Sequence, residues 1–119
     1  MSTTSILDFS RERAPLQERF IENSSLLGKR MLALETRTFE AGALDCRQKE
    51  MLGLMASLVL RCEDCIQYHV IECRRQGVSL DQLRELLDIA LMIGGSITIP
   101  HIRRIHLYWE ELEQNPGAV

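Results

Sequence analysis

Two cysteines and a histidine lie close together near the middle of the 119-residue chain: Cys62, Cys65 and His69. On a helix, Cys65 and His69 would share one face, and Cys62 would lie one turn before Cys65. Two neighbouring thiols can cycle between a dithiol and a disulfide, and a nearby imidazole can accept a thiol proton. The spacing therefore indicates reversible thiol redox chemistry.

Two further features would activate a thiol at this place. The N–H groups and dipole of a helix start favour a thiolate, and the pKa of a C-x-x-C thiol can fall well below the free value of about 8.5. Glu50 lies eleven residues before a predicted turn at Arg61, and His69 lies eight after it, so an antiparallel hairpin brings them within about one helical turn. An imidazole that lies between a carboxylate and a thiol can form a proton relay with them. Considered alone, Glu50 is more typical of an exposed first-turn charge.

A metal site and inert packing are the alternatives. Cys62 and Cys73 are eleven residues apart, roughly 16 Å along a helix, and metal–ligand bonds of about 2.0–2.3 Å cannot span that distance. Only Cys62, Cys65 and His69 with an outside ligand could hold zinc. A c-type haem needs a histidine directly after the second cysteine, where this chain has Ile66.

The remaining cysteines and histidines are not expected to take part in chemistry. Cys46 and Cys73 have no nearby C-x-x-C partner, and buried free cysteines are commonly inert small hydrophobes. His101 and His106 belong to the last helical segment, where His106 could face inward, and no spacing places either near Cys65.

Residues 1–44 predict N-terminal helices with weak boundaries. A loose helical stripe covers residues 6–20, and Pro15 must break, kink or begin a helix there. Residues 23–25 offer caps for a second short helix, and residues 40–44 predict a connection.

Sharper signals follow from residue 45 onward. Asp45 with Gln48, and Ser79 with Gln82, are capping pairs that predict helix starts, and Gly77 is a typical helix end. The expected helices span about residues 45–60, 62–76, 79–94 and a last segment around 102–112, whose start near Pro100 is ambiguous. No strand-like alternation is present, so the prediction is an all-α single domain over residues 1–119, with its core in residues 45–114.

Composition narrows the functional classes. A formal net charge of −3 argues against nucleic-acid binding driven by overall charge. The longest apolar run, residues 51–60, is shorter than the roughly 20 residues that span a bilayer, and predicts a fully buried helix. The N-terminus shows no secretory signal, so we expect a cytoplasmic protein without a membrane partner.

The pattern Glu50, eleven residues, then Cys62-x-x-Cys65-x-x-x-His69 resembles the E-x11-C-x-x-C-x-x-x-H signature of the AhpD-like alkylhydroperoxidases. These belong to the carboxymuconolactone decarboxylase superfamily. The flanking segments 44–51, 76–79 and 90–95 match as well, and the resemblance covers about residues 40–112. The chain is most similar to the short, single-domain members.

This resemblance implies an AhpD-like bundle of about six helices that assembles as a homotrimer or homohexamer. It implies a peroxidase that needs no cofactor and no metal, with a hydroperoxide as substrate and an unidentified thiol reductant as partner. Cys65 would attack the peroxide and become a sulfenic acid, Cys62 would resolve it to a disulfide, and His69 and Glu50 would form the relay that deprotonates Cys65. The apolar helix 51–60 suggests an organic hydroperoxide.

One position departs from the family pattern. The peroxidases carry a second histidine just before the second cysteine, where this chain has Asp64. A carboxylate beside Cys65 raises the pKa of that thiol unless the side chain turns away or caps a backbone N–H. Asp64 therefore favours an alternative, a non-catalytic redox-sensing or assembly module that forms the same disulfide. Lactone decarboxylation is less expected, because the decarboxylase branch lacks the cysteine pair.

Overall fold

The computed structural model describes residues 5–119; residues 1–4, part of the segment searched for a secretory signal, lie outside the described range. The described chain contains α1 (Ile6–Asn23), α2 (Leu26–Thr38), α3 (Cys46–Leu60), α4 (Glu63–Arg75), α5 (Leu80–Gly94), the short 3-10 turn η1 (Ser96–Thr98) and α6 (Ile99–Gln114). Residues 5–119 contain no strand, and the all-α prediction of about six helices is confirmed.

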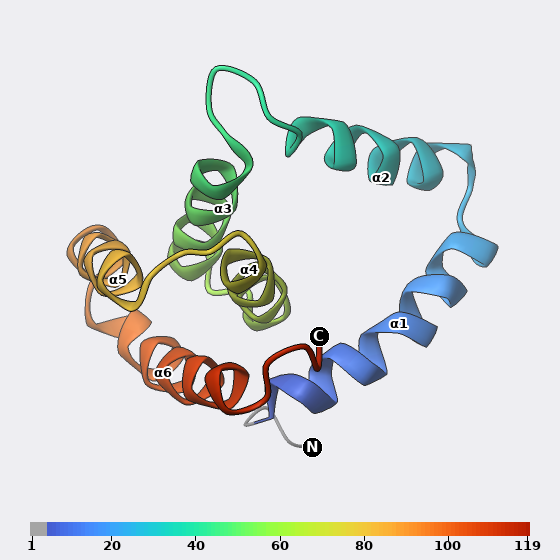
Figure 1. The fold of residues 1–119 in the computed structure, drawn as a ribbon. Coiled ribbons are helices and arrows are strands. Elements are labelled where there is room, and N and C mark those ends of the chain that lie inside the picture. The colour runs from blue at the N-terminus through green and yellow to red at the C-terminus, as the bar shows by residue number, and fades with distance from the viewer. Residues whose placement is uncertain (1–4) are drawn as a thin grey trace.

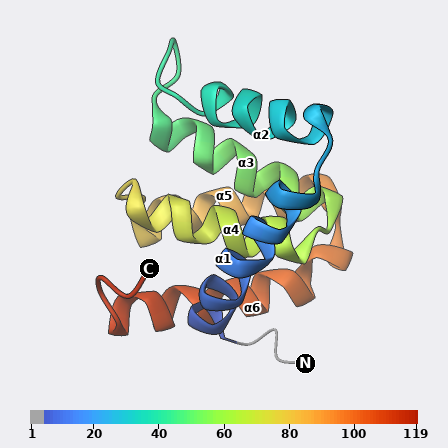
Figure 2. The same ribbon diagram turned by 90° about the vertical axis from the view of Figure 1, so that its right-hand side faces the viewer.

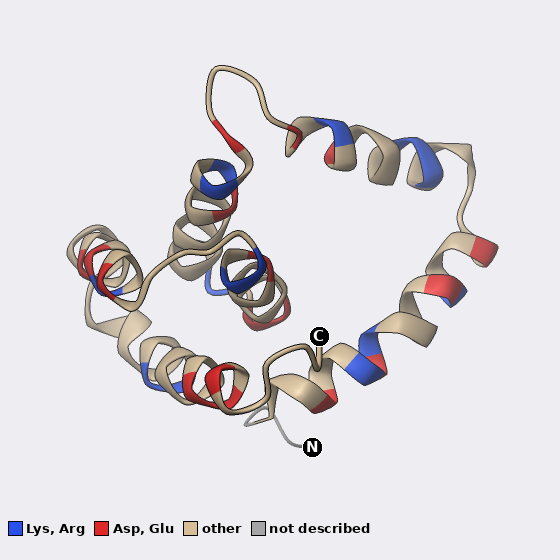
Figure 3. Cartoon of the chain, in the orientation of Figure 1, with Lys and Arg blue, Asp and Glu red and all other residues tan. Residues whose placement is uncertain are grey.

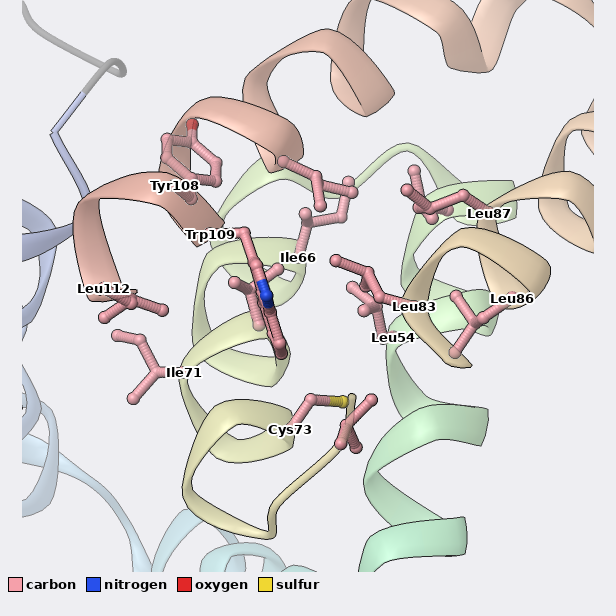
Figure 4. Packing of buried hydrophobic residues seen from close by; sticks show 14 of the residues in the cluster. Leu54, Ile66, Ile71, Cys73, Leu83, Leu86, Leu87, Tyr108, Trp109 and Leu112 are labelled. Carbon is pink, nitrogen blue, oxygen red and sulfur yellow. The ribbon is translucent and has the colours of Figure 1, made fainter. Parts of the chain in front are cut away.

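The helices of the core surround α4. Helices α3 and α4 form an antiparallel hairpin, α5 packs against α3, and α6 packs against α4 (Figure 1). Two aromatic side chains of α6, Tyr108 and Trp109, are fully buried in this core together with aliphatic residues of α3, α4 and α5 (Figure 4). Burial of each such side chain stabilises the fold by roughly 1.5–3 kcal/mol, so this packing fixes the position of α4 and its cysteines.

Local signals determine where the core helices begin and end. Asp45 with Gln48, and Ser79 with Gln82, form complete capping boxes at the starts of α3 and α5. Each N-cap contributes about 1 kcal/mol. Arg61 adopts the left-handed conformation, with φ 58°, and reverses the chain between α3 and α4. The predicted hairpin turn at this residue is therefore confirmed.

Helices α1 and α2 form an N-terminal arm that arcs around one side of the core in Figure 1, with α2 above α3 in Figure 2. The start of α1 is attached to α6, because Glu111 accepts hydrogen bonds from the Ile6 N–H at 2.7 Å and the Ser5 hydroxyl at 3.1 Å. Helix α2 buries no side chain. Its apolar residues Leu27 and Met31 are exposed to 79% and 65%.

Two expectations about individual helices change in part. Of the three outcomes expected at Pro15, a break and a helix start are wrong, because α1 continues through it, and a kink stays a prediction. Pro15 and Arg11, whose carbonyl loses its usual helical donor, are both exposed, so water can satisfy that carbonyl. Helix α3 is not fully buried: α4 and α5 cover part of its surface and leave Leu52 and Leu60 exposed.

The surface carries charges of both signs. Lys and Arg are interspersed with Asp and Glu along the helices in Figure 3. Among residues 5–119, no helix combines the length and the apolar character that crossing a bilayer would require.

Candidate functional site

The cysteine pair occupies the first turn of α4. Cys62 is the N-cap residue, one position before the helix begins, and its sulfur accepts a hydrogen bond from the Cys65 N–H at 3.3 Å. A disulfide joins Cys62 and Cys65, whose Cα atoms are 5.3 Å apart, a separation within the ordinary range for a disulfide. Cys65 is exposed and Cys62 is half-buried, so solvent reaches the cysteine pair at the start of α4.

Glu50 and His69 meet across the α3–α4 hairpin. Glu50 Oε1 lies 2.8 Å from His69 Nδ1, and Glu50 is only 7% exposed. The alternative of an exposed first-turn charge is therefore wrong for Glu50. A proton on Nδ1 that donates to the carboxylate fixes the imidazole tautomer and leaves Nε2 as the acceptor.

Three neighbours hold the His69 ring in place. The ring lies 5.5 Å from the Phe39 ring and 5.2 Å from the Tyr68 ring, measured between centroids. On the third side it packs against Gly53 of α3, where an added Cβ would lie 2.7 Å from His69 Cε1. Sequence reasoning missed Gly53, although it lies three residues after Glu50 and therefore on the same helix face.

A cavity of about 540 Å³ opens beside Cys65 and His69. Its apolar wall comes from Phe9, Leu16 and Phe20 of α1. The apolar run 51–60 does not contribute to this cavity: Met51, Leu52 and Met55 line a separate groove between α3 and α5. The arm makes the cavity, because α1 lies opposite the start of α4.

The polar part of the cavity is mixed in charge. The Arg13 guanidinium lies over the Tyr68 ring, 4.5 Å from its centroid. Burial, together with the carboxylates of Glu72, Glu50 and Glu35, raises the pKa of Tyr68, and its phenol stays protonated at neutral pH. Asp64 lines the same cavity and is exposed.

Sequence reasoning also missed a polar cluster behind the motif. The carboxylate of Glu63 contacts three side chains of α6: His101 Nδ1 at 2.6 Å, the Tyr108 hydroxyl at 2.7 Å, and Arg104 at 3.1 Å from Nη2 and 3.2 Å from Nε. A signal was present, since residues 101, 104 and 108 share one helix face. Burial raises the pKa of Glu63, but the hydrogen bonds from His101, Tyr108 and Arg104 outweigh it and hold the pKa below its usual value.

The other candidate residues lie away from the cysteine pair or make different contacts. Cys73 is fully buried in the core, as predicted, and burial with the nearby carboxylates of Glu50 and Glu72 raises the pKa of its thiol to about 12. Cys46 is half-buried. The expectation that His106 could face inward is wrong, because the side chain lies on the exposed face of α6. Within residues 5–119, no three His, Cys, Asp or Glu side chains converge as metal ligands.

Comparisons with known proteins agree with this arrangement. The family model of the Carboxymuconolactone decarboxylase family matches residues 26–105. A Thermotoga maritima protein of that family, named with a suggested involvement in the antioxidative response, is 44% identical; its crystal structure superimposes with a TM-score of 0.85 over 90% of this chain and 91% of that chain.

Two more distant relatives extend the comparison. A carboxymuconolactone decarboxylase family protein from Legionella pneumophila shares the fold, with 20% identity and a TM-score of 0.81 over 89% of this chain and 95% of that chain. A Paracoccus denitrificans protein named "Uncharacterized protein 4 in cox locus" is 29% identical over 82 residues, 69% of this chain and 74% of that protein. The chain therefore belongs to the carboxymuconolactone decarboxylase family, as its resemblance to the AhpD-like members predicts.

Proposed function

We propose that the chain is a cytoplasmic thiol-dependent reductase of hydroperoxides that uses Cys65 and Cys62. The observation that carries this proposal is the combination of a Cys62–Cys65 disulfide with a buried Glu50–His69 pair, since Cys65 and His69 line the same cavity. A thiol pair supplies the two electrons of peroxide reduction, and the paired imidazole supplies a proton acceptor. No bound cofactor is needed for this reaction.

The proposed reaction has three balanced steps. The Cys65 thiolate attacks the terminal oxygen of the hydroperoxide, the O–O bond breaks, and the alkoxide leaves as the alcohol after taking the proton held by His69. The sulfur of Cys65 is thereby oxidised to a sulfenic acid. Cys62 then attacks that sulfur, water leaves, and the disulfide forms. An external dithiol then reduces the Cys62–Cys65 disulfide to two thiols and is itself oxidised to a disulfide.

Two properties of the cavity support an organic hydroperoxide as substrate. Phe9, Leu16 and Phe20 form its apolar wall, and its volume of about 540 Å³ lies within the roughly 300–1,000 Å³ typical of small-molecule sites. An alkyl group can therefore bind against α1 while the peroxide meets Cys65.

Homo-oligomerisation into a trimer or hexamer belongs to this proposal. The arm exposes Leu27, Met31 and Leu34 of α2 to 62–79%, and the groove between α3 and α5 exposes Leu52 and Ile89 to 52% and 53%. Large exposed apolar areas of this kind are typical of subunit contacts. Sedimentation measurements at several concentrations test the assembly.

Cysteine variants test the function. After one equivalent of an organic hydroperoxide, Cys65→Ser should consume no peroxide, whereas Cys62→Ser should consume one equivalent and retain a sulfenic acid that a dimedone-type reagent traps. Cys46→Ser serves as the matched control and should consume the peroxide as the unmodified protein does. Continued turnover of Cys65→Ser would contradict the assignment of the attacking thiol.

A redox-sensing module is the second candidate. Asp64 lies in the cavity next to Cys65, and its negative charge opposes thiolate formation. Such a module would oxidise slowly and change its assembly when the disulfide forms. Comparing the sedimentation of the reduced and oxidised protein separates the two functions, because an enzyme that cycles needs no change of assembly.

A further inference from the structure

Glu63 stands between the two cysteines in sequence, but its side chain points away from them into α6. As the first residue of α4 it directly follows the N-cap Cys62. Its carboxylate contacts His101, Arg104 and Tyr108 at 2.6–3.2 Å. The backbone segment that carries both sulfur atoms is thus attached to a neighbouring helix through its central side chain.

The strength of this attachment follows from its chemistry. The hydrogen bonds from Arg104 to a carboxylate are charge-assisted, and such bonds are roughly twice as strong as neutral ones. The low pKa of Glu63 keeps the carboxylate ionised at neutral pH. Gln67, one turn further along α4, donates to the Tyr108 hydroxyl at 3.2 Å, so the contact between α4 and α6 extends over two turns.

The attachment matters most when the disulfide is open. Helix ends fray readily, and once the disulfide opens no covalent bond joins Cys62 to Cys65. With the disulfide closed, the local hydrogen bonds of this turn are those from the Ile66 N–H to the Cys62 carbonyl at 2.9 Å and from the Cys65 N–H to the Cys62 sulfur at 3.3 Å. A fixed Glu63 restricts the separation that the two thiols can reach. This restriction raises the effective concentration of one thiol at the other and so favours the disulfide.

We propose that Glu63 is a positioning residue that sets the thiol–disulfide equilibrium of the Cys62–Cys65 pair. The proposal requires the disulfide couple, but it does not require a hydroperoxide substrate. A failure of the proposed peroxidase function therefore leaves it standing, and the two are tested separately.

The experiment equilibrates the full-length protein with mixtures of reduced and oxidised dithiothreitol and measures the oxidised fraction after acid quench and alkylation. In this exchange the protein disulfide takes two electrons and two protons, and dithiothreitol becomes its cyclic disulfide. Glu63→Ala should lower the equilibrium constant for the protein disulfide about tenfold, which corresponds to about 30 mV for a two-electron couple.

Glu111→Ala is the matched control. Glu111 also forms a carboxylate attachment at α6, but it holds Ser5 and Ile6 of α1. Both variants should lower the thermal midpoint, and only Glu63→Ala should shift the thiol–disulfide equilibrium. An unchanged equilibrium in a folded Glu63→Ala protein, or an equal shift in both variants, overturns the proposal.

A second variant covers the case in which Glu63→Ala does not fold. Glu63→Gln keeps the side-chain length and an acceptor oxygen for Tyr108 but loses the charge that binds Arg104. It should lower the equilibrium constant about threefold. An equilibrium constant equal to that of the unmodified protein would overturn the proposal that the charged attachment of Glu63 to Arg104 positions the cysteines.

Discussion

Gly53 offers a direct test of the geometry around His69. Replacing Gly53 with Ala places a methyl group 2.7 Å from His69 Cε1, 2.9 Å from Nδ1 and 3.0 Å from Nε2. The ring can move away from this methyl group only by losing its contact with Glu50, which lies 2.8 Å from Nδ1, or by moving against the Phe39 ring. The substitution should therefore displace the imidazole and break its contact with the carboxylate.

The expected magnitude combines two opposing effects. Ala stabilises a helix interior by about 1 kcal/mol relative to Gly. Overpacking a well-filled site costs about 1–3 kcal/mol. With a cost of about 2 kcal/mol, Gly53→Ala should lower the free energy of unfolding by about 1 kcal/mol. When His69 is already Ala, the obstruction is absent, and the same change should raise that free energy by about 1 kcal/mol. The coupling energy between the two positions is then about 2 kcal/mol.

Urea unfolding of the unmodified protein, both single variants and the double variant measures this coupling. All four proteins are kept with the Cys62–Cys65 disulfide closed, so that the redox state does not contribute. Gly42→Ala is the control: an added Cβ there would lie 3.7 Å from Lys49 Nζ, an ordinary contact, and His69 is not among the atoms within 4 Å of it. A stabilisation by Gly53→Ala of equal size in both His69 backgrounds would refute the packing argument.

Three further predictions concern the relay, the buried thiol and a helix cap. Glu50→Gln should slow hydroperoxide oxidation of Cys65 about tenfold or more in stopped-flow mixing, because the neutral amide stabilises a protonated imidazole less well. Cys73 should resist iodoacetamide at pH 8 until the protein is unfolded. An unfolded thiol loses its proton near pH 8.5, whereas burial and nearby carboxylates raise the pKa of Cys73 in the folded protein to about 12. Between these two pH values the unfolded state binds fewer protons than the folded state. The free energy of unfolding measured in urea should therefore fall as the pH rises through this range. Asp45→Ala removes the acceptor of the 2.7 Å hydrogen bond from the Gln48 N–H and should cost about 1 kcal/mol in the same assay.

Local chemistry made much of the core predictable. Capping residues such as Asp45 and Ser79 bind backbone groups only three positions away, so the starts of α3 and α5 can be predicted from the sequence. The meeting of Glu50 with His69 was predictable for a related reason. It depends only on one turn and on the rise per residue of two helices.

Features that depend on how the helices pack were harder to predict from the sequence. Glu63 looks like an ordinary acidic residue in a first helical turn, and its contacts with His101 and Tyr108 form only when α6 packs against α4. The cavity wall follows from the path of the arm, which the weak stripe of residues 6–20 does not define. The apolar run predicts a buried Leu60, because such runs are usually buried, but Leu60 is the last residue of α3 and is 77% exposed.

The lack of burial in α2 has a consequence for backbone dynamics. A helix of 13 residues is near the length, about 12–15 residues, below which isolated helices are marginal in water. Because none of the α2 side chains is fully buried, the amide protons of α2 should exchange with solvent far faster than those of α3 and α4, whose exchange requires opening of the core. Contact with a second copy would slow the exchange of α2 selectively. Amide exchange in α2 is therefore a sensitive gauge of assembly that is independent of any catalytic assay.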